Sequence, residues 1–183
     1  MKNESNTARE NEINNQAISN PEEYKESVIK SLDKNFVDNA TRIFREASGE
    51  KFKDTFEKVP YRKVDNDEAA RLKEKIGRDL SGYEHNITNT DIRHMFTEHG
   101  NKEVEEFKGQ RAITERDILL IPEITKNYDD ARLSPEKSRV TQQDVIIYKK
   151  KIGDEYIYLE TIGGKKSKEL RSKTMWIIKG KGK

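Results

Sequence analysis

The sequence predicts an α+β fold in which helices pack on a small antiparallel β-sheet and a helical extension precedes them. Two observations predict it. Apolar residues recur at helical spacing, between capping residues and glycines, over residues 20–121. Three strand-like runs follow with short connections, which favours an antiparallel meander. We therefore expect a disordered N-terminus over residues 1–19, a helical extension over 20–80 and a second domain over 81–183.

The N-terminal region predicts disorder and then one long helix. Residues 1–19 are rich in Asn, Glu and Ser and hold few side chains to bury. A helix is predicted over residues 21–48, because Asn20 can cap it, Pro21 suits its first position and Gly49 ends it. Apolar residues recur every three or four positions along it. We expect this helix to be a separate or accessory element that needs a partner surface.

Shorter elements follow between residues 67 and 142. Helices are expected over 67–76, 91–99 and 114–120, where apolar residues have helical spacing. Gly77 should end the first, Thr88–Asp91 can form a capping box before the second, and Thr114 can cap the third. Residues 107–113 should be extended, and the polar residues 127–142 should form a loop.

Three strands are predicted at Val145–Lys151, Tyr156–Ile162 and Thr174–Lys179. Side chains alternate between the two faces of a strand. The face expected to join the core collects Ile147, Ile157, Leu159, Met175 and Ile177. The other face is expected to collect Tyr148, Lys150, Tyr156, Tyr158, Glu160, Thr174 and Trp176.

Composition excludes several classes of protein. Charged residues make up 38% of the chain and hydrophobic residues 32%, and no window approaches the roughly 18 apolar residues of a membrane span. The first residues hold no apolar stretch typical of a secretion signal. There is no cysteine, which excludes disulfides, a thiol nucleophile and a cysteine-based zinc site. Residues 145–183 hold 11 Lys and Arg against 4 Asp and Glu, which suggests a contact with a polyanion or a solvated lysine tail.

The aromatic face and the histidines suggest chemistry on RNA. Tyrosine and tryptophan side chains beside a lysine can stack bases and hold phosphates, although such side chains also suit any half-exposed strand. His94 points away from the apolar side of its predicted helix, whereas His99 lies on that side, in the last turn. A surface histidine and a packed histidine at a helix end are the structural alternatives. Two histidines near a basic patch would suit RNA cleavage, with one base and one acid around the phosphate.

Residues between Gly82 and Lys179 resemble the phage-associated branch of the barnase, EndoU, colicin E5/D and RelE-like nucleases, whose shared architecture is called the BECR fold. Such domains occur in polyvalent proteins of phages and conjugative elements and at the tips of some toxins. The matching residues are His85-Asn86-Ile87, Asp91-Ile92-Arg93-His94, His99-Gly100, Gly109-Gln110, Asp117, Ile121-Pro122-Glu123-Ile124, Tyr148-Lys149, Glu160 and Thr174-Met175. The resemblance implies a metal-independent ribonuclease with helices on a four-stranded antiparallel sheet, and it identifies residues 81–183 as the nuclease domain.

The resemblance also directs the choice of site residues. His94 is the leading acid or base, and His99 is its partner or orients it. Glu160 would act as a general base in the manner of barnase, and Thr174 would donate to the scissile phosphate. The residues expected to bind substrate are His85, Tyr148, Lys149, Lys150, Tyr158, Arg171, Lys173 and Trp176.

These observations favour an endoribonuclease that acts as an effector or toxin of a phage or mobile element. RNA is the expected substrate, with tRNA as one candidate, and an immunity or inhibitor protein is a second expected partner. We expect no cofactor, no metal ion and no membrane contact, and a location in the bacterial cytoplasm, in a virion or after delivery. The alternative is a non-catalytic RNA-binding or phage structural module on the same fold.

Overall fold

The computed structural model describes residues 8–49, except 10, 13, 16 and 18, and residues 55–181. In this part of the chain the helices are α2 (Pro21–Ser31), α3 (Lys34–Ser48), α4 (Asn66–Ile76), α5 (Asn89–His99), α6 (Lys102–Phe107), α7 (Glu115–Leu119) and α8 (Ile121–Lys126). The strands are β1 (Lys58–Lys63), β2 (Glu84–Thr88), β3 (Gln110–Arg111), β4 (Asp130–Leu133), β5 (Val145–Ile152), β6 (Asp154–Ile162) and β7 (Glu169–Ile178).

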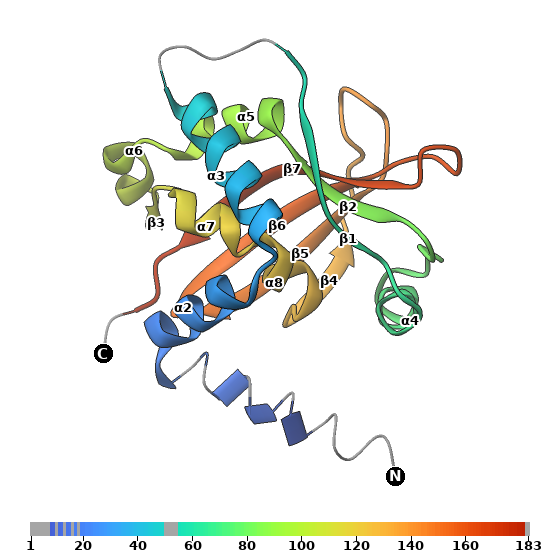
Figure 1. The fold of residues 1–183 in the computed structure, drawn as a ribbon, viewed down its shortest axis with the longest axis horizontal. Helices are drawn as coiled ribbons and strands as arrows, with labels where there is room; N and C mark the ends of the chain where they lie inside the picture. The colour runs from blue at the N-terminus through green and yellow to red at the C-terminus, as the bar shows by residue number, and fades with distance from the viewer. Residues whose placement is uncertain are drawn as a thin grey trace.

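The described strands form one sheet in the order β1-β2-β7-β6-β5-β4, and β3 pairs with β7. Helices α2, α3, α7 and α8 lie over one face of this sheet (Figure 1). The antiparallel meander of β5, β6 and β7 confirms the predicted α+β class. The sheet is nevertheless not wholly antiparallel, because β2 and β7 pair in parallel. A long stretch of chain separates these two strands, so no tight turn fixes their relative direction.

The single helix predicted over residues 21–48 is two helices. Leu32 has extended backbone angles and ends α2. Asp33 then starts α3 as its N-cap, and its side chain accepts a hydrogen bond from the Phe36 amide at 3.2 Å. Aspartate is a strong N-cap residue, so this short polar side chain restarts the helix within a continuous apolar pattern.

The predicted helix ends are confirmed where local chemistry sets them. Gly77 ends α4 in the left-handed conformation, with φ of 70°. Thr88 caps α5 and accepts from the Asp91 amide at 3.1 Å. Thr114 and Asp117 form a reciprocal capping box at α7. The loop predicted over residues 127–142 is interrupted by β4.

The N-terminal region belongs to the same folded unit as the sheet, so two predictions about it do not hold. For residues 1–7, 10, 13, 16 and 18 the predicted disorder lies outside the described residues. The described residues between 8 and 19 are helical, and Ala17 is buried in the core. The predicted boundary between residues 80 and 81 does not separate two bodies, because β1 pairs with β2 and forms the edge of the sheet. Packing also places α3 against α5, so the N-terminal helices are not an accessory element.

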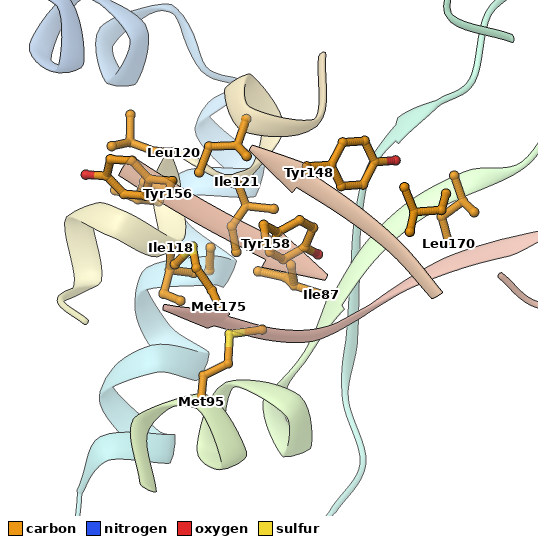
Figure 2. Packing of buried hydrophobic residues seen from close by; sticks show 14 of the residues in the cluster. Ile87, Met95, Ile118, Leu120, Ile121, Tyr148, Tyr156, Tyr158, Leu170 and Met175 are labelled. Atoms are coloured by element: carbon orange, nitrogen blue, oxygen red, sulfur yellow. The ribbon is translucent and has the colours of Figure 1, made fainter. Parts of the chain in front are cut away.

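The two faces of the sheet are not those predicted. Tyr148, Tyr156 and Tyr158 are fully buried on the helix-covered face, together with Met175. Figure 2 shows two of these rings, Tyr156 and Tyr158, packed among apolar side chains of α7 and α8. Cross-strand pairing leaves Ile147, Leu159 and Thr174 on the opposite face.

The tyrosines enter the core because buried partners satisfy two of their hydroxyl groups. Tyr156 donates to Asp117 at 2.9 Å, and Tyr148 donates to Glu160 at 2.9 Å. A buried polar group is tolerated when it is hydrogen-bonded. Within the described residues, no helix has the length and apolar content needed to span a bilayer.

Candidate active site

The structure divides the predicted site residues between the two faces of the sheet. One group lies on the helix-covered face and is fully or almost fully buried: His85, Tyr148, Lys150, Tyr158 and Glu160. The second group lies on or beside the opposite face and reaches solvent: His94, His99, Lys149, Arg171, Lys173, Thr174 and Trp176. Only the second group is placed to contact a macromolecular substrate.

The buried group is centred on the Glu160 carboxylate. Its oxygens accept hydrogen bonds from Nδ1 of His85 at 2.7 Å, from the Tyr148 hydroxyl at 2.9 Å and from the Tyr61 hydroxyl at 3.1 Å. The other ring nitrogen of His85, Nε2, lies 2.7 Å from a carboxylate oxygen of Glu68. With a carboxylate at each nitrogen, both nitrogens can donate only when the ring is an imidazolium.

Charge is balanced within this buried group. Burial by itself lowers the pKa of His85, but the carboxylates of Glu160 and Glu68 outweigh it and raise that pKa above its ordinary value. Burial likewise disfavours the charged form of Glu68, yet hydrogen bonds from His85 and Arg62 lower the pKa of Glu68 to about 2. Arg62 holds Glu68 through two hydrogen bonds, of 3.0 and 2.7 Å. Two cations therefore face two carboxylates inside the core.

This burial corrects the expectation that the tyrosine face meets RNA. The Glu160 side chain is 0% exposed, so it cannot remove a proton from a substrate in this conformation. Lys150 is also enclosed, and its ammonium group donates to Asn14 at 3.1 Å and to Asp129 at 3.4 Å. The phenol rings of Tyr148 and Tyr158 lie under the helices rather than in solvent. These residues stabilise the fold.

The exposed group forms where α5 runs alongside β7. Near the start of the helix, Asp91 receives two hydrogen bonds from Arg171, of 2.7 and 3.1 Å. At its end, the His99 ring lies 6.1 Å from the Trp176 ring, measured between centroids. Thr174 falls between these two contacts along the strand. The helix therefore follows the strand past the predicted threonine.

A β-bulge lies at the same place. Leu159 of β6 pairs with Thr174, whereas the next residue, Glu160, pairs with Ser172. Lys173 is the extra residue that no residue of β6 opposes. Bulges redirect side chains and occur often beside active sites. This one turns Lys173 toward the cavity described next.

A cavity of about 380 Å³ opens between α5, β7 and the loop that precedes β5. Its walls carry five charged or titratable residues: His94, Arg171, Lys173, Asp91 and Glu169. The rest of the lining consists of five hydroxyl residues and three others: Ser138, Thr141, Thr161, Ser167 and Ser172, with Val140, Gln143 and Gly163. The two acidic residues are ion-paired, Asp91 with Arg171 and Glu169 with Lys58. Lys173 forms no ion pair with any described residue. The cavity therefore offers cations and hydroxyl donors, the groups that bind phosphate.

His99 has a partner that the sequence did not reveal. Its Nδ1 lies 3.1 Å from a carboxylate oxygen of Glu105, which is fully buried and also accepts from Lys108 at 3.1 Å. Glu105 lies beyond Gly100, on a different helix, so helical spacing gives no signal for this pair. A carboxylate at Nδ1 fixes the orientation of an imidazole and leaves Nε2 available.

Two other parts of the site were also missed. The sequence suggests only a helix-capping role for Asp91. Its ion pair with Arg171 forms because β7 lies beside α5 in the fold. The loop over residues 138–143 contributes to the cavity, although its polar sequence predicts only a loop. Within the described part of the chain, no three His, Cys, Asp or Glu side chains gather in a way that could hold a metal ion.

Comparison with known proteins identifies the family. The model of the family described as phage-Barnase-EndoU-ColicinE5/D-RelE like nuclease3 matches residues 62–183, which is two thirds of the chain. The match starts within β1 and includes the whole of the exposed site. No curated protein and no solved structure shows significant similarity to the chain. The chain therefore belongs to the phage-Barnase-EndoU-ColicinE5/D-RelE like nuclease3 family, and residues 62–183 are its nuclease domain.

Proposed function

We propose that this nuclease domain is an endoribonuclease that uses the site between α5 and β7. The observation that carries the proposal is the position of His94, which is exposed and lines the same cavity as Arg171 and Lys173. An acid–base side chain next to two cations suits cleavage at a phosphodiester. The phage association of the family favours a role as an effector of a phage or mobile element, acting on host RNA such as tRNA.

The proposed reaction is an intramolecular transesterification. A general base removes the proton from the ribose 2′-hydroxyl, and that oxygen attacks the neighbouring phosphorus. The bond between phosphorus and the 5′-oxygen breaks as a general acid gives a proton to that oxygen. The products are a 2′,3′-cyclic phosphate and a free 5′-hydroxyl. DNA lacks the 2′-hydroxyl and is therefore not a substrate.

We assign each residue of the exposed site a role in this reaction. His94 is the leading acid or base because it opens onto the cavity. His99, oriented by Glu105, is the second such group. Arg171 and Lys173 would neutralise the charge that develops on the phosphate. Thr174 lies on β7 between Arg171, which contacts Asp91, and Trp176, which contacts His99. The assignment no longer includes Glu160, which is enclosed.

A non-catalytic RNA-binding role is the second candidate. One observation favours it: both carboxylates of the cavity, Asp91 and Glu169, are ion-paired, so neither is free to act as the base. In that case the cations and hydroxyl groups would bind RNA without cleaving it. The two functions differ in whether His94 changes the rate of a reaction or only the affinity.

Incubation of the purified protein with total tRNA and with single-stranded DNA, both in EDTA, tests the proposal. We expect cleavage of RNA alone, with 2′,3′-cyclic phosphate ends detected by end-group analysis. His94→Ala should lose about 10²–10⁴-fold in rate, the usual contribution of a positioned acid or base. Glu98→Ala is the matched control, since Glu98 is an exposed residue of the same helix and outside the cavity.

The control should cleave at the wild-type rate and melt at the same temperature. Equal cutting of DNA, or loss of cleavage in EDTA, would contradict the proposed mechanism. RNA binding without cleavage by the wild-type protein would favour the binding module.

A further inference from the structure

Phe56 is an exposed aromatic side chain beside the candidate site. Its exposed fraction is 54%. The guanidinium carbon of Arg171 lies 5.2 Å from the centroid of its ring. Phe56 precedes residue 62, where the match to the nuclease family begins. A residue from outside the matched region therefore contacts a cation of the cavity.

The backbone on both sides of Phe56 is fixed to the start of α5. The Asn89 side chain, which is almost fully buried, accepts from the Glu57 amide at 2.9 Å and donates to the Thr55 carbonyl at 2.7 Å. The Asn89 amide donates to the Glu57 carbonyl at 3.1 Å. Three hydrogen bonds to one residue thus fix the backbone on both sides of Phe56, and the ring itself lies against the Arg171 guanidinium. An aromatic ring that is already ordered loses little entropy when a ligand stacks on it.

Arg171 is held equally firmly on the other side. Asp91 binds its guanidinium through two hydrogen bonds, and the ring of Phe56 lies beside the same group. The adjacent cavity holds Lys173 and His94. An aromatic surface beside cations matches a nucleotide, whose base stacks on a ring while its phosphate meets positive charge.

We propose that Phe56 is a stacking platform for an unpaired base of RNA whose phosphate lies at Arg171 and Lys173. The proposal rests on the proposed function and adds that the substrate is single-stranded at this position, since a base within a duplex has no free face. It also assigns a role in substrate binding to the segment before the matched nuclease region.

Direct binding measurements test the stacking without relying on cleavage. A short fluorescein-labelled single-stranded RNA is titrated with protein carrying His94→Ala, and affinity is read from anisotropy. In this background Phe56→Leu keeps an apolar side chain but removes the aromatic face, and it should weaken binding about 5- to 150-fold. Phe56→Tyr should restore the affinity. Phe107→Leu is the matched control, because Phe107 is 95% exposed and does not line the cavity.

A set of RNAs with one abasic nucleotide at each position locates the stacked base. With Phe56 present, one abasic position should weaken binding, and with Phe56→Leu the same position should have no further effect. Equal losses at that position in both proteins, or unchanged affinity in Phe56→Leu, would overturn the stacking proposal. Tighter binding of a fully paired duplex would overturn it as well.

The two proposals can fail separately. If wild-type protein cleaves RNA but Phe56→Leu binds normally, only the stacking is wrong. If the protein never cleaves RNA but one abasic position weakens binding only when Phe56 is present, the stacking proposal is supported and the catalytic function is wrong.

Discussion

Replacement of Glu160 by glutamine distinguishes a structural carboxylate from a catalytic one. Glutamine keeps the shape of the side chain but removes its charge and puts a donor where one carboxylate oxygen was. His85 and Tyr148 both donate to this carboxylate, at 2.7 and 2.9 Å, so one of these donors loses its acceptor. The imidazolium and the Arg62 guanidinium would then face the single carboxylate of Glu68.

The expected cost follows from this burial. The side chains of His85 and Glu160 are both 0% exposed, so water cannot compensate for the lost charge. Removal of one partner of a buried ion pair costs about 3–5 kcal/mol. For a domain of this size each kcal/mol lowers the melting temperature by roughly 2–4 °C, so we expect a fall of about 6–20 °C.

Urea unfolding and thermal melting measure this cost, and RNA cleavage is measured on the same samples. Glu155→Gln is the control, because Glu155 lies on the same strand with a 37% exposed side chain, 3.5 Å from Lys149. Exposed ion pairs are worth about 0–1 kcal/mol, so this variant should melt near wild type. If Glu160→Gln keeps wild-type stability but loses cleavage more than 100-fold, the carboxylate acts on substrate and its structural assignment is wrong.

Four further predictions concern pH, salt and packing. The raised pKa of His85 means that its charge stabilises the fold fully below the unfolded pKa of about 6.5, and that this contribution is lost as pH rises through the folded pKa. The difference in unfolding free energy between wild type and His85→Gln should therefore shrink as pH rises above about 6.5. Glu68 has the opposite dependence on pH. Its contribution to the free energy of unfolding is present above about pH 4.5 and is lost as pH falls toward its folded pKa of about 2. Comparison of acid unfolding between Glu68→Gln and wild type measures this loss. Affinity for single-stranded RNA should fall with salt, and Lys173→Ala should reduce the slope of log affinity against log salt by about 0.7, whereas an unchanged slope would remove Lys173 from the phosphate contacts. Leu120→Ala in the core should cost about 2–5 kcal/mol in urea unfolding, and a loss below about 1 kcal/mol would contradict the packing described for α7 and α8.

Local signals in the sequence predicted much of the fold. The strands β5 and β6 were predicted within two residues, because alternating and β-branched residues between turn signals define them. β7 begins at Glu169, five residues before its predicted start. Gly77 and Thr88 gave correct helix ends, since each acts on backbone groups of its own segment. The break at Asp33 was missed because the apolar spacing continues across it. The direction of β2 relative to β7 had no local signal at all.

The candidate site could be predicted only in part. His94, Arg171 and Lys173 do lie around one cavity, where their residue types suggested contact with phosphate. The role predicted for Glu160 did not survive, because residue types alone gave no reason to prefer a buried carboxylate over an exposed one. Its partner His85, and Glu68 at the other nitrogen of that histidine, come from distant segments. Their charges balance only because the fold brings these segments together.

The sequence by itself determined several helices, most of the meander of β5, β6 and β7, and the basic C-terminal segment, because each depends on neighbours within a few residues. It did not predict β1, β2, β4 or the cap at Asp33. The tertiary structure decided which face of the sheet is the core. On β5, alternation groups Tyr148 with Lys150 but cannot say which side the helices cover. Contacts between distant segments made that choice. On the covered face, buried carboxylates accept hydrogen bonds from tyrosine hydroxyls. Beside the other face, the bulge at Lys173 and the packing of α5 along β7 form the cavity.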